Sequence, residues 1–446
     1  MTHAPSKLRA QRETAFARVA TLLAASALVL AAIGCANKGE RDATHAEARD
    51  ASAGGGAGAQ GGERVLRFWQ FWDAALVEPL VREFEGANPG VRVEMETLTW
   101  ASGFEKIVVA IASNKAPDLV ELGSTWVPKF AAEGALRDLT GDVADLRGSL
   151  VQWESGMRGD RAYAIPWLVG TRVLFANRNL LAKAGFGDDA PAPDTWAELL
   201  AASRAIHAPD RGVYGFGMNA GERHVLYKKF LPFVWSNGGD VLDAQGRPAL
   251  ASAQSVEALV FYKSLVPYSL LERQDQLDLA FEEGRLGFTI SGGWLGKRLA
   301  EKGDAIRWTI APLPRPRADA PPSASFAGAE MLAIPAGSQH ADDALRLARF
   351  LVDGRRALVI AEREKSVLPA ATDSTVRAYY EAHPDERVYL DVLTTAKAPP
   401  AHAGWVEMQE ALNVAIEEVL FGRAEPAAAL ARADSQIARL VAPAHP

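Results

Sequence analysis

The sequence predicts an α/β fold, because segments of strand and helix character alternate along the chain from Arg64 onward. Residues 65–69 are an apolar run of strand length, and apolar residues at helical spacing follow it between Leu76 and Phe84. Residues 91–96 then alternate apolar and charged side chains, which is the period of a half-buried strand. Strand, helix and strand joined by short connections form parallel βαβ units, so the predicted class is α/β.

The alternation continues through the middle of the chain and gives way to helices near its end. Thr195 and Glu198 have the spacing of a capping box, which predicts a helix that runs to Ile206. From residue 341 onward the pattern is mostly helical, with Gly354 and Gly422 as C-terminal stops. Further strands are predicted at residues 118–122, 286–290, 306–310 and 326–334, and another helix at 104–111.

Length and composition are typical of a folded protein with about two or three compact units. The chain has 446 residues, 48% of them apolar, with a formal net charge of -7 and a pI near 5.7. Residues 1–34 carry four basic side chains and one acidic one, so the rest of the chain stands at about -10, that is, -7 minus 3. This acidic balance disfavours a dedicated nucleic-acid binder, which would present a basic face.

The N-terminus resembles a bacterial lipoprotein signal peptide over residues 1–34. A basic stretch precedes an apolar run, residues 19–34, that ends at the only cysteine, Cys35. The run is short for a membrane span, which needs about 20 residues, but suits a secretion signal. We expect the Cys35 thiol to be lipidated and residues 36–63, which lack large apolar side chains, to form a flexible linker. The alternative is a buried core cysteine after an ordinary signal or anchor helix.

The sequence contains none of the common catalytic or metal-binding motifs. There is no G-x-S-x-G elbow, P-loop or H-E-x-x-H pattern, and no Cys or His pair at metal-ligand spacing. The glycines of residues 215–221 do not have dinucleotide-binding spacing, and we expect a turn there. A glycosidase pair of carboxylates stays open, since its two members need not be close in the chain. We predict a binding protein with no catalytic residue, cofactor or metal.

Tryptophans are numerous, and several are predicted to lie where strands end. The chain has eleven, and ligands of open α/β sheets bind outside the carboxyl ends of strands. Indole faces suit the C–H faces of a pyranose ring, so a carbohydrate site is expected; the alternative for each one is a place in the core. Those at predicted strand-to-loop junctions are Trp69, Trp72, Trp126, Trp167, Trp235, Trp294 and Trp405.

Several segments resemble family 1 of the extracellular solute-binding proteins of ABC importers, the group that includes maltose-binding protein. The resemblance runs from about Val65 to the C-terminus, with Phe175 and Ala176 standing where tyrosines are commoner in the family. The segments that carry it are F-E-G-A-N-P-G-V-R-V at 84–93, A-P-D-L-V-E-L at 116–122, Y-A-I-P at 163–166, L-F-A-N-R-N-L-L at 174–181, P-D-T-W-A-E-L at 193–199 and L-G-F-T-I-S-G-G-W at 286–294.

The resemblance implies a two-lobed periplasmic-binding-protein fold (type II), with a ligand cleft between lobes joined by crossing strands. The crossings are expected at about 172–177 and 326–334. Lobe 1 would then comprise residues 64–174 and 335–371, and lobe 2 residues 175–325 and 372–446. The family binds its solute as the lobes close and passes it to the membrane permease of the importer. The resemblance also implies that the protein is a monomer and lies outside the cytoplasm, where its lipid would anchor it to the membrane.

The resemblance also implies a set of ligand-binding residues. Trp294 and Trp405 correspond to stacking tryptophans of lobe 2, and Glu330 lies on the second crossing, where an ion pair with Arg172 is the alternative role. The full predicted set is Gln70, Trp72, Asp73, Trp126, Trp167, Trp235, Trp294, Glu330 and Trp405.

Other functions remain open at this point. The family also takes glycerol phosphodiesters, and Arg172 is the one candidate for binding a phosphate. A secreted carbohydrate-active enzyme and a sensory lipoprotein are the further alternatives.

Overall fold

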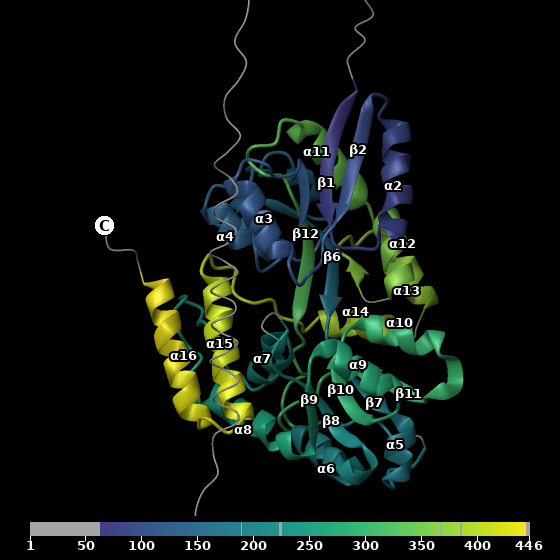
Figure 1. Cartoon of the computed structure of the whole chain (residues 1–446), viewed down its shortest axis with the longest axis vertical. Coiled ribbons are helices and arrows are strands. Elements are labelled where there is room, and N and C mark those ends of the chain that lie inside the picture. Colours follow the sequence, from purple (N-terminus) through teal and green to yellow (C-terminus); the bar gives the residue numbers. More distant parts are fainter. Residues whose placement is uncertain (1–62, 189, 223–224, 366, 384–385, 443–446) are drawn as a thin grey trace, which may run out of the picture. The chain divides into compact units, whose positions relative to one another are not determined.

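The computed structural model describes residues 63–442, apart from 189, 223–224, 366 and 384–385 (Figure 1). Residues 61–446 form one compact unit, and the alternation of strands and helices confirms the predicted α/β class. The predicted signal peptide, Cys35 and nearly all of the linker lie outside the described residues. Within the described part of the chain, none of the helices has the length and apolar character to cross a membrane.

The first of two large sheets has six strands in the order β13-β6-β12-β3-β1-β2. β1 pairs in parallel with β2 and β3, whereas β12 runs antiparallel between β3 and β6, and β13 runs antiparallel to β6. The strands are β1 (Arg64–Gln70), β2 (Val91–Thr97), β3 (Leu119–Gly123), β6 (Ala164–Thr171), β12 (Ala327–Ala333) and β13 (Leu368–Pro369).

Helices from both ends of the described chain accompany this sheet. α2 begins at its N-cap Asp73, whose carboxylate accepts from the Ala75 N–H, and buries Val77 and Phe84 against the core. The helices are α2 (Ala74–Ala87), α3 (Gly103–Ala112), α4 (Val127–Ala132), α11 (Ala341–Leu351), α12 (Gly354–Glu364), α13 (Ser374–Ala382) and α14 (Arg387–Leu393). A two-stranded ribbon is formed by β4 (Met157–Arg158) and β5 (Arg161–Ala162).

The prediction that Gly354 stops a helix is wrong, because α12 begins there. A Cβ at Gly354 would lie 1.9 Å from an oxygen of Asp373, so glycine is required for that close approach. Gly422, by contrast, follows the end of α15 with φ of +67°, as a helix stop requires.

The second sheet has five strands in the order β11-β7-β10-β8-β9. β8 pairs in parallel with β9 and β10, and β7 runs antiparallel to β10 and β11. Its strands are β7 (Val173–Asn177), β8 (Tyr214–Asn219), β9 (Ser269–Glu272), β10 (Leu286–Ser291) and β11 (Trp308–Ala311).

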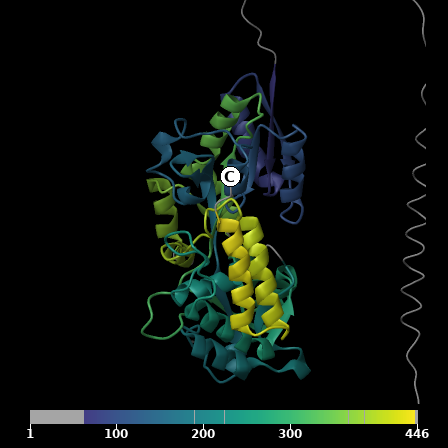
Figure 2. The ribbon, with the colours of Figure 1, turned by 90° about the vertical axis from the view of Figure 1, so that its left-hand side faces the viewer.

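The helices that follow or cover the second sheet include the last two of the chain, α15 and α16, which pack side by side (Figures 1 and 2). They are α5 (Arg178–Lys183), α6 (Trp196–Ile206), α7 (Leu226–Ser236), α8 (Ala253–Ser264), α9 (Gln274–Glu282), α10 (Gly293–Glu301), α15 (Trp405–Leu420) and α16 (Pro426–Val441). The capping box of Thr195 and Glu198 is present at the start of α6, as predicted. Short 3-10 helices occupy residues 144–146, 153–156, 209–211, 266–268 and 303–305.

The turn predicted at residues 215–221 is mostly a strand, β8. A Cβ at Gly215 would lie 1.9 Å from the carbonyl oxygen of Ser203 on α6, so glycine lets the helix lie directly against the strand. Gly217 would likewise meet a methyl of Leu286 at 2.6 Å. Close packing therefore explains glycines that sequence alone favours as a turn.

The chain passes between the two sheets three times, and the passages are tied together. Arg172 alone separates β6 from β7, and the Ser325 hydroxyl accepts from its N–H at 3.0 Å and donates to its carbonyl at 2.6 Å. The third passage lies at Lys397, whose N–H donates to the Ser325 carbonyl at 2.9 Å and whose carbonyl accepts from the Ala327 N–H at 2.8 Å.

Sequence reasoning located two of these passages and expected the third between residues 371 and 372, whereas the chain passes at Lys397. β7 belongs wholly to the second sheet and β12 wholly to the first. Residues 372–396 include α13, which packs on α12, and α14, which contacts β6, although they were assigned to the second lobe. The lobe boundaries themselves stay a prediction.

Candidate functional site

Charged and aromatic side chains from both sheets gather where the chain passes between them. β10 ends at Ser291, whose neighbour on β7 is Val173, so Arg172 lies at the carboxyl end of β10. This is the edge at which open α/β sheets bind ligands. We call this group the junction cluster; its members are Arg172, Tyr227, Lys228, Lys229, Asp278, Trp294, Phe326 and Glu330.

Trp294 is held in the junction cluster by the turn that precedes α10. A Cβ at Gly292 would lie 2.0 Å from the indole, so glycine lets the ring fold back over the backbone. The indole N–H donates to Asp278 at 2.8 Å, and the Arg172 guanidinium carbon lies 4.7 Å from the ring centroid. Trp294 is half-buried. It therefore has the fixed orientation and partial exposure expected of a stacking residue.

Lys229 and Asp278 lie on the buried side of Trp294. The Lys229 Nζ donates to the Ile290 carbonyl at 2.8 Å, and burial holds the pKa of this ammonium well below its usual range. Asp278 accepts from Gln274 at 2.7 Å and from Ser291 at 3.0 Å, besides Trp294, and burial raises the pKa of its carboxyl group. Both groups are thus hydrogen-bonded to neutral partners.

Arg172 and Lys228 are less well partnered. Arg172 donates from Nη1 to the Thr171 carbonyl at 3.1 Å, while its buried Nε–H has no acceptor in the described part of the chain. Lys228 forms no hydrogen bond or ion pair with a described residue, and its Nζ lies 5.8 Å from the Phe326 ring centroid. Burial lowers the pKa of Arg172 to about 10, and burial together with the Arg172 charge lowers the pKa of Lys228 to about 8.

Glu330 is a half-buried carboxylate on β12, next to an irregularity in its pairing with β6. Burial raises the pKa of Glu330 to about 7, against the opposing effects of Lys228 and Arg172. The ion pair with Arg172, its alternative role, is not formed at contact distance among the described residues, although the two charges attract each other and each shifts the pKa of the other. Glu121 on β3 is fully buried, and its pKa is also raised, first by burial and then by the charge of Glu330.

A second group, the aromatic cluster, lies at the carboxyl ends of β1, β2 and β3 and consists of Phe71, Trp100, Phe104 and Trp126. Phe71 and Trp100 stack with centroids 4.1 Å apart, and Trp126 lies 5.4 Å from Trp100 and 5.2 Å from Phe104. Trp126 is only 5% exposed, whereas Trp100 is 44% exposed. Sequence reasoning missed Trp100, although its place just after the strand 91–96 was the signal that selected other tryptophans.

The predicted loop residues after β1 make mainly structural contacts. Gln70 is fully buried; its amide donates to Thr97 at 2.8 Å and its carbonyl accepts from the Trp72 N–H. Asp73 caps α2 at 3.0 Å. Trp72 is half-buried, and its indole N–H has no acceptor among the described residues. Of these three, only Asp73 has an exposed polar group, its carboxylate.

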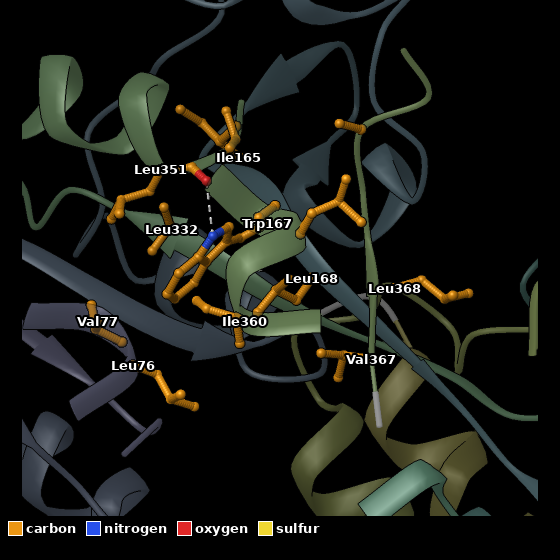
Figure 3. Close-up of a cluster of buried hydrophobic side chains, with 14 of the residues drawn as sticks. Leu76, Val77, Ile165, Trp167, Leu168, Leu332, Leu351, Ile360, Val367 and Leu368 are labelled. Atoms are coloured by element: carbon orange, nitrogen blue, oxygen red, sulfur yellow. Dashed lines mark hydrogen bonds between the residues drawn. The ribbon is translucent and has the colours of Figure 1, made fainter. Parts of the chain in front are cut away.

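Trp167 lies in the hydrophobic core of the first sheet, not at a strand end (Figure 3). It is fully buried, and its indole N–H donates to the Leu351 carbonyl at 3.1 Å. The pattern Ile165-Pro166 was interpreted as the end of a strand, but Pro166 lies within β6. The pairing with β12 shifts register there, and such a bulge tolerates a residue without an N–H.

Trp235 and Trp405 lie in the core of the second sheet beside the junction cluster. Trp235 donates to Asp240 at 2.9 Å and stacks on Phe326 at 6.3 Å. Trp405 is 1% exposed, meets the edge of Tyr227 at 5.6 Å, and has a buried indole N–H without an acceptor among described residues. The structure thus brings Trp294 and Glu330 together, with Trp235 and Trp405 behind them.

A pocket of about 760 Å³ lies elsewhere, at the opposite end of the first sheet. It is lined by residues of α3 and by 335–340. Asp118, its buried carboxylate, accepts from the Arg67 N–H at 2.9 Å and from Ser338 at 2.8 Å. Because these oxygens are already bonded, we do not place the functional site there. No group of three or more His, Cys, Asp or Glu suited to a metal occurs among the described residues.

Two α/β sheets, three passages between them and a cluster of unpartnered polar groups at the strand ends are the features of a solute-binding protein. The chain belongs to the bacterial extracellular solute-binding protein family, which matches residues 72–353. The members of this family are extracytoplasmic binding proteins, and the predicted two-lobed binding-protein fold is confirmed by solved structures.

Relatives and solved structures with this fold bind several kinds of solute. The diacetylchitobiose binding protein DasA of Streptomyces coelicolor is 28% identical over 278 residues, 59% of this chain and 62% of DasA. An ABC transporter solute-binding protein from Thermotoga lettingae, bound with α-D-tagatose, superposes with a TM-score of 0.76 at 24% identity, over 84% of this chain and 99% of that one. UgpB from Mycobacterium tuberculosis, in complex with glycerophosphocholine, superposes with a TM-score of 0.74 at 19% identity, over 85% of this chain and 99% of UgpB.

Proposed function

We propose that this protein captures a saccharide between its two sheets and delivers it to the membrane permease of an ABC importer. The observation that carries the proposal is the half-buried Trp294, whose orientation is fixed while buried polar groups near it lack partners. Buried polar groups without partners are rare in folded proteins, and sugar hydroxyls can both donate to them and accept from them. The sugar-binding functions named for DasA and for the tagatose complex support this reading.

The proposed mechanism is closure of two lobes on the ligand, with the lobes meeting where the chain passes between the sheets, at Arg172, Ser325 and Lys397. A ligand that contacts both sheets binds the closed form more tightly than the open form, so binding shifts the equilibrium toward closure. Side chains of both sheets already act on one another electrostatically, since Glu330 on β12 affects the pKa of Lys228 on α7. The closed form would then be the one that the permease recognises.

The experiment that tests the proposal is a thermal-shift screen of the chain without residues 1–35 against neutral and charged saccharides. A ligand that binds only the native state raises Tm by mass action, equivalent to about 2.7 kcal/mol at a hundred times Kd. We expect at least one saccharide to raise Tm and to remain chemically intact after incubation. Absence of any shift across the panel would contradict the saccharide proposal, and turnover of the ligand would favour the enzyme alternative.

We further propose that Cys35 carries the lipid that anchors a monomeric protein to the outer face of a bacterial membrane. The apolar run and the lone cysteine of the sequence support this. Cys35→Ser is expected to release the protein from the membrane fraction. Unchanged membrane association and processing of that variant would refute the anchor.

A further inference from the structure

The charged groups of the junction cluster and its surroundings divide into those with neutral hydrogen-bonding partners and those without. Asp278 accepts from three neutral donors, and Glu121 accepts from the Phe71 N–H at 2.8 Å. Glu222 accepts from the Asn219 amide at 2.8 Å and the Gln274 N–H at 2.9 Å. These three carboxylates therefore have hydrogen bonds of their own and form no ion pair with a described cation, although Asp278 and Glu222 attract Lys229 electrostatically.

The cations and one carboxylate form the other class. Lys229 donates to a backbone carbonyl, but Lys228 has no hydrogen-bonding partner among the described residues and Arg172 reaches only its neighbour's carbonyl. Glu330, the remaining carboxylate, is within ion-pair distance of none of them in the described chain. The cluster thus holds more positive charge than its own acidic groups neutralise by contact.

Arg172 and Lys228 also lie near the same aromatic ring. The guanidinium carbon of Arg172 and the ammonium of Lys228 each lie 5.8 Å from the centroid of Phe326. Arg172 and Lys228 are both half-buried, so two like charges lie beside one ring, and an anion between them would relieve their repulsion. Three helices, α7, α10 and α15, begin around this point, and none has a side-chain N-cap, so their positive ends add to the same potential.

We propose that the captured solute carries an anionic group, a carboxylate or a phosphate, which binds between Arg172 and Lys228 at the edge of Phe326. The inference rests on the proposed function, because it names the class of saccharide that the same site takes. Trp294 would then contact the sugar ring, while the two cations recognise its charge. A wholly neutral sugar would leave both cations without a counter-charge, so the site discriminates against it.

The test is calorimetric titration of the chain without residues 1–35 with three probes: a neutral disaccharide, a digalacturonate and glycerophosphocholine. Residues 61–446 form one compact unit, which supports use of this chain. Lys228→Gln is the main variant, because Lys228 makes no bond whose loss would affect folding. Arg432→Gln, on the exposed helix α16 and paired with Glu418, is the matched control for loss of one positive charge.

We expect an anionic probe to bind more tightly than the neutral one, and its affinity to fall about tenfold or more in Lys228→Gln but not in Arg432→Gln. Added salt should weaken the same binding. Binding of digalacturonate alone identifies the group as a carboxylate on a sugar. Binding of glycerophosphocholine alone would confirm the anion site and would contradict the proposal that the solute is a saccharide.

Two outcomes would overturn the inference. If the neutral disaccharide binds as tightly as the anionic probes and Lys228→Gln leaves its Kd unchanged, the proposed function survives and the anion site does not exist. If an anionic probe binds but is insensitive to Lys228→Gln, to Arg172→Gln and to salt, its charge is recognised elsewhere.

Discussion

The aromatic cluster and the junction cluster lie at the ends of strands in different sheets, and they differ in how complete they are. Phe71, Trp100 and Trp126 pack on one another, so that group is held together by its own contacts. In the junction cluster, Arg172 and Lys228 lie beside the same ring, Phe326, and neither forms an ion pair with a described acidic residue. The first group needs no ligand to be stable, whereas the second gains from one. Binding energy should therefore depend more on the junction cluster than on the number of aromatic rings.

The largest effect is expected for Trp167→Ala, which removes a tryptophan that belongs to neither cluster. The side chain is fully buried in the core, so truncation should cost about 3–5 kcal/mol of unfolding free energy. Intrinsic affinity, measured per folded molecule, should not change. Denaturant unfolding checks the stability of this variant, and calorimetry checks its affinity. A loss of affinity without a loss of stability would show that Trp167 contacts the ligand.

A smaller effect is expected for Trp294→Ala, and it concerns ligand affinity instead of the free energy of unfolding. Loss of a stacking partner should weaken ligand binding roughly ten- to hundredfold, or about 1–3 kcal/mol. Stability of the free protein should fall much less than in Trp167→Ala, because the side chain is only half-buried. The comparison fails if both variants lose stability equally and neither loses affinity. Trp405, at 1% exposure, should resemble Trp167 in stability.

The third prediction concerns pH and sharpens the contrast between satisfied and unsatisfied charges. Folding raises the pKa of Glu330 from 4.5 to about 7, so the native state favours its protonated form. Its contribution to stability is therefore full below pH 4.5 and is lost as pH rises through about 7. Glu330→Gln cannot ionise at this position, so its stability should match that of the parent near pH 4.5. Above pH 7 its free energy of unfolding should exceed that of the parent by about 1–3 kcal/mol, with a correspondingly higher Tm.

Thermal unfolding of both proteins across that pH range is the measurement. A Tm difference that is constant with pH would mean that Glu330 does not titrate in this window. A variant less stable than the parent at high pH would mean that the ionised carboxylate stabilises Arg172 and Lys228 after all.

The elements of the fold were largely predictable, because periodicity marks strands and amphipathic helices wherever the apolar pattern is regular. β8 was missed since its glycines suggest a turn, and their reason lies in α6, a separate segment. Trp294 was found through the glycines before it. Trp167 could not be distinguished from it, because the bulge that keeps Pro166 inside β6 is a property of the pairing with β12.

The charged part of the site was mostly invisible in the sequence. Arg172 and Glu330 were noted, but Lys228 and Lys229 come from a helix, α7, that was not predicted, and their importance arises from burial against distant segments. A lysine pair in a sequence ordinarily indicates a solvated surface. Only the three-dimensional arrangement shows that these ammonium groups share a space with Trp294 and Phe326.

The hydrogen bonds of Ser325 place Arg172 at the hinge of the proposed closure. Its main chain is hydrogen-bonded to the neighbouring passage at both its N–H and its carbonyl, while its guanidinium lies over the ring of Trp294 in the proposed ligand site. Residues at a hinge move little when the lobes close, so we expect the Arg172 guanidinium to keep its position during the closure. In the proposed closure, this guanidinium would therefore be a fixed reference against which the two sheets turn.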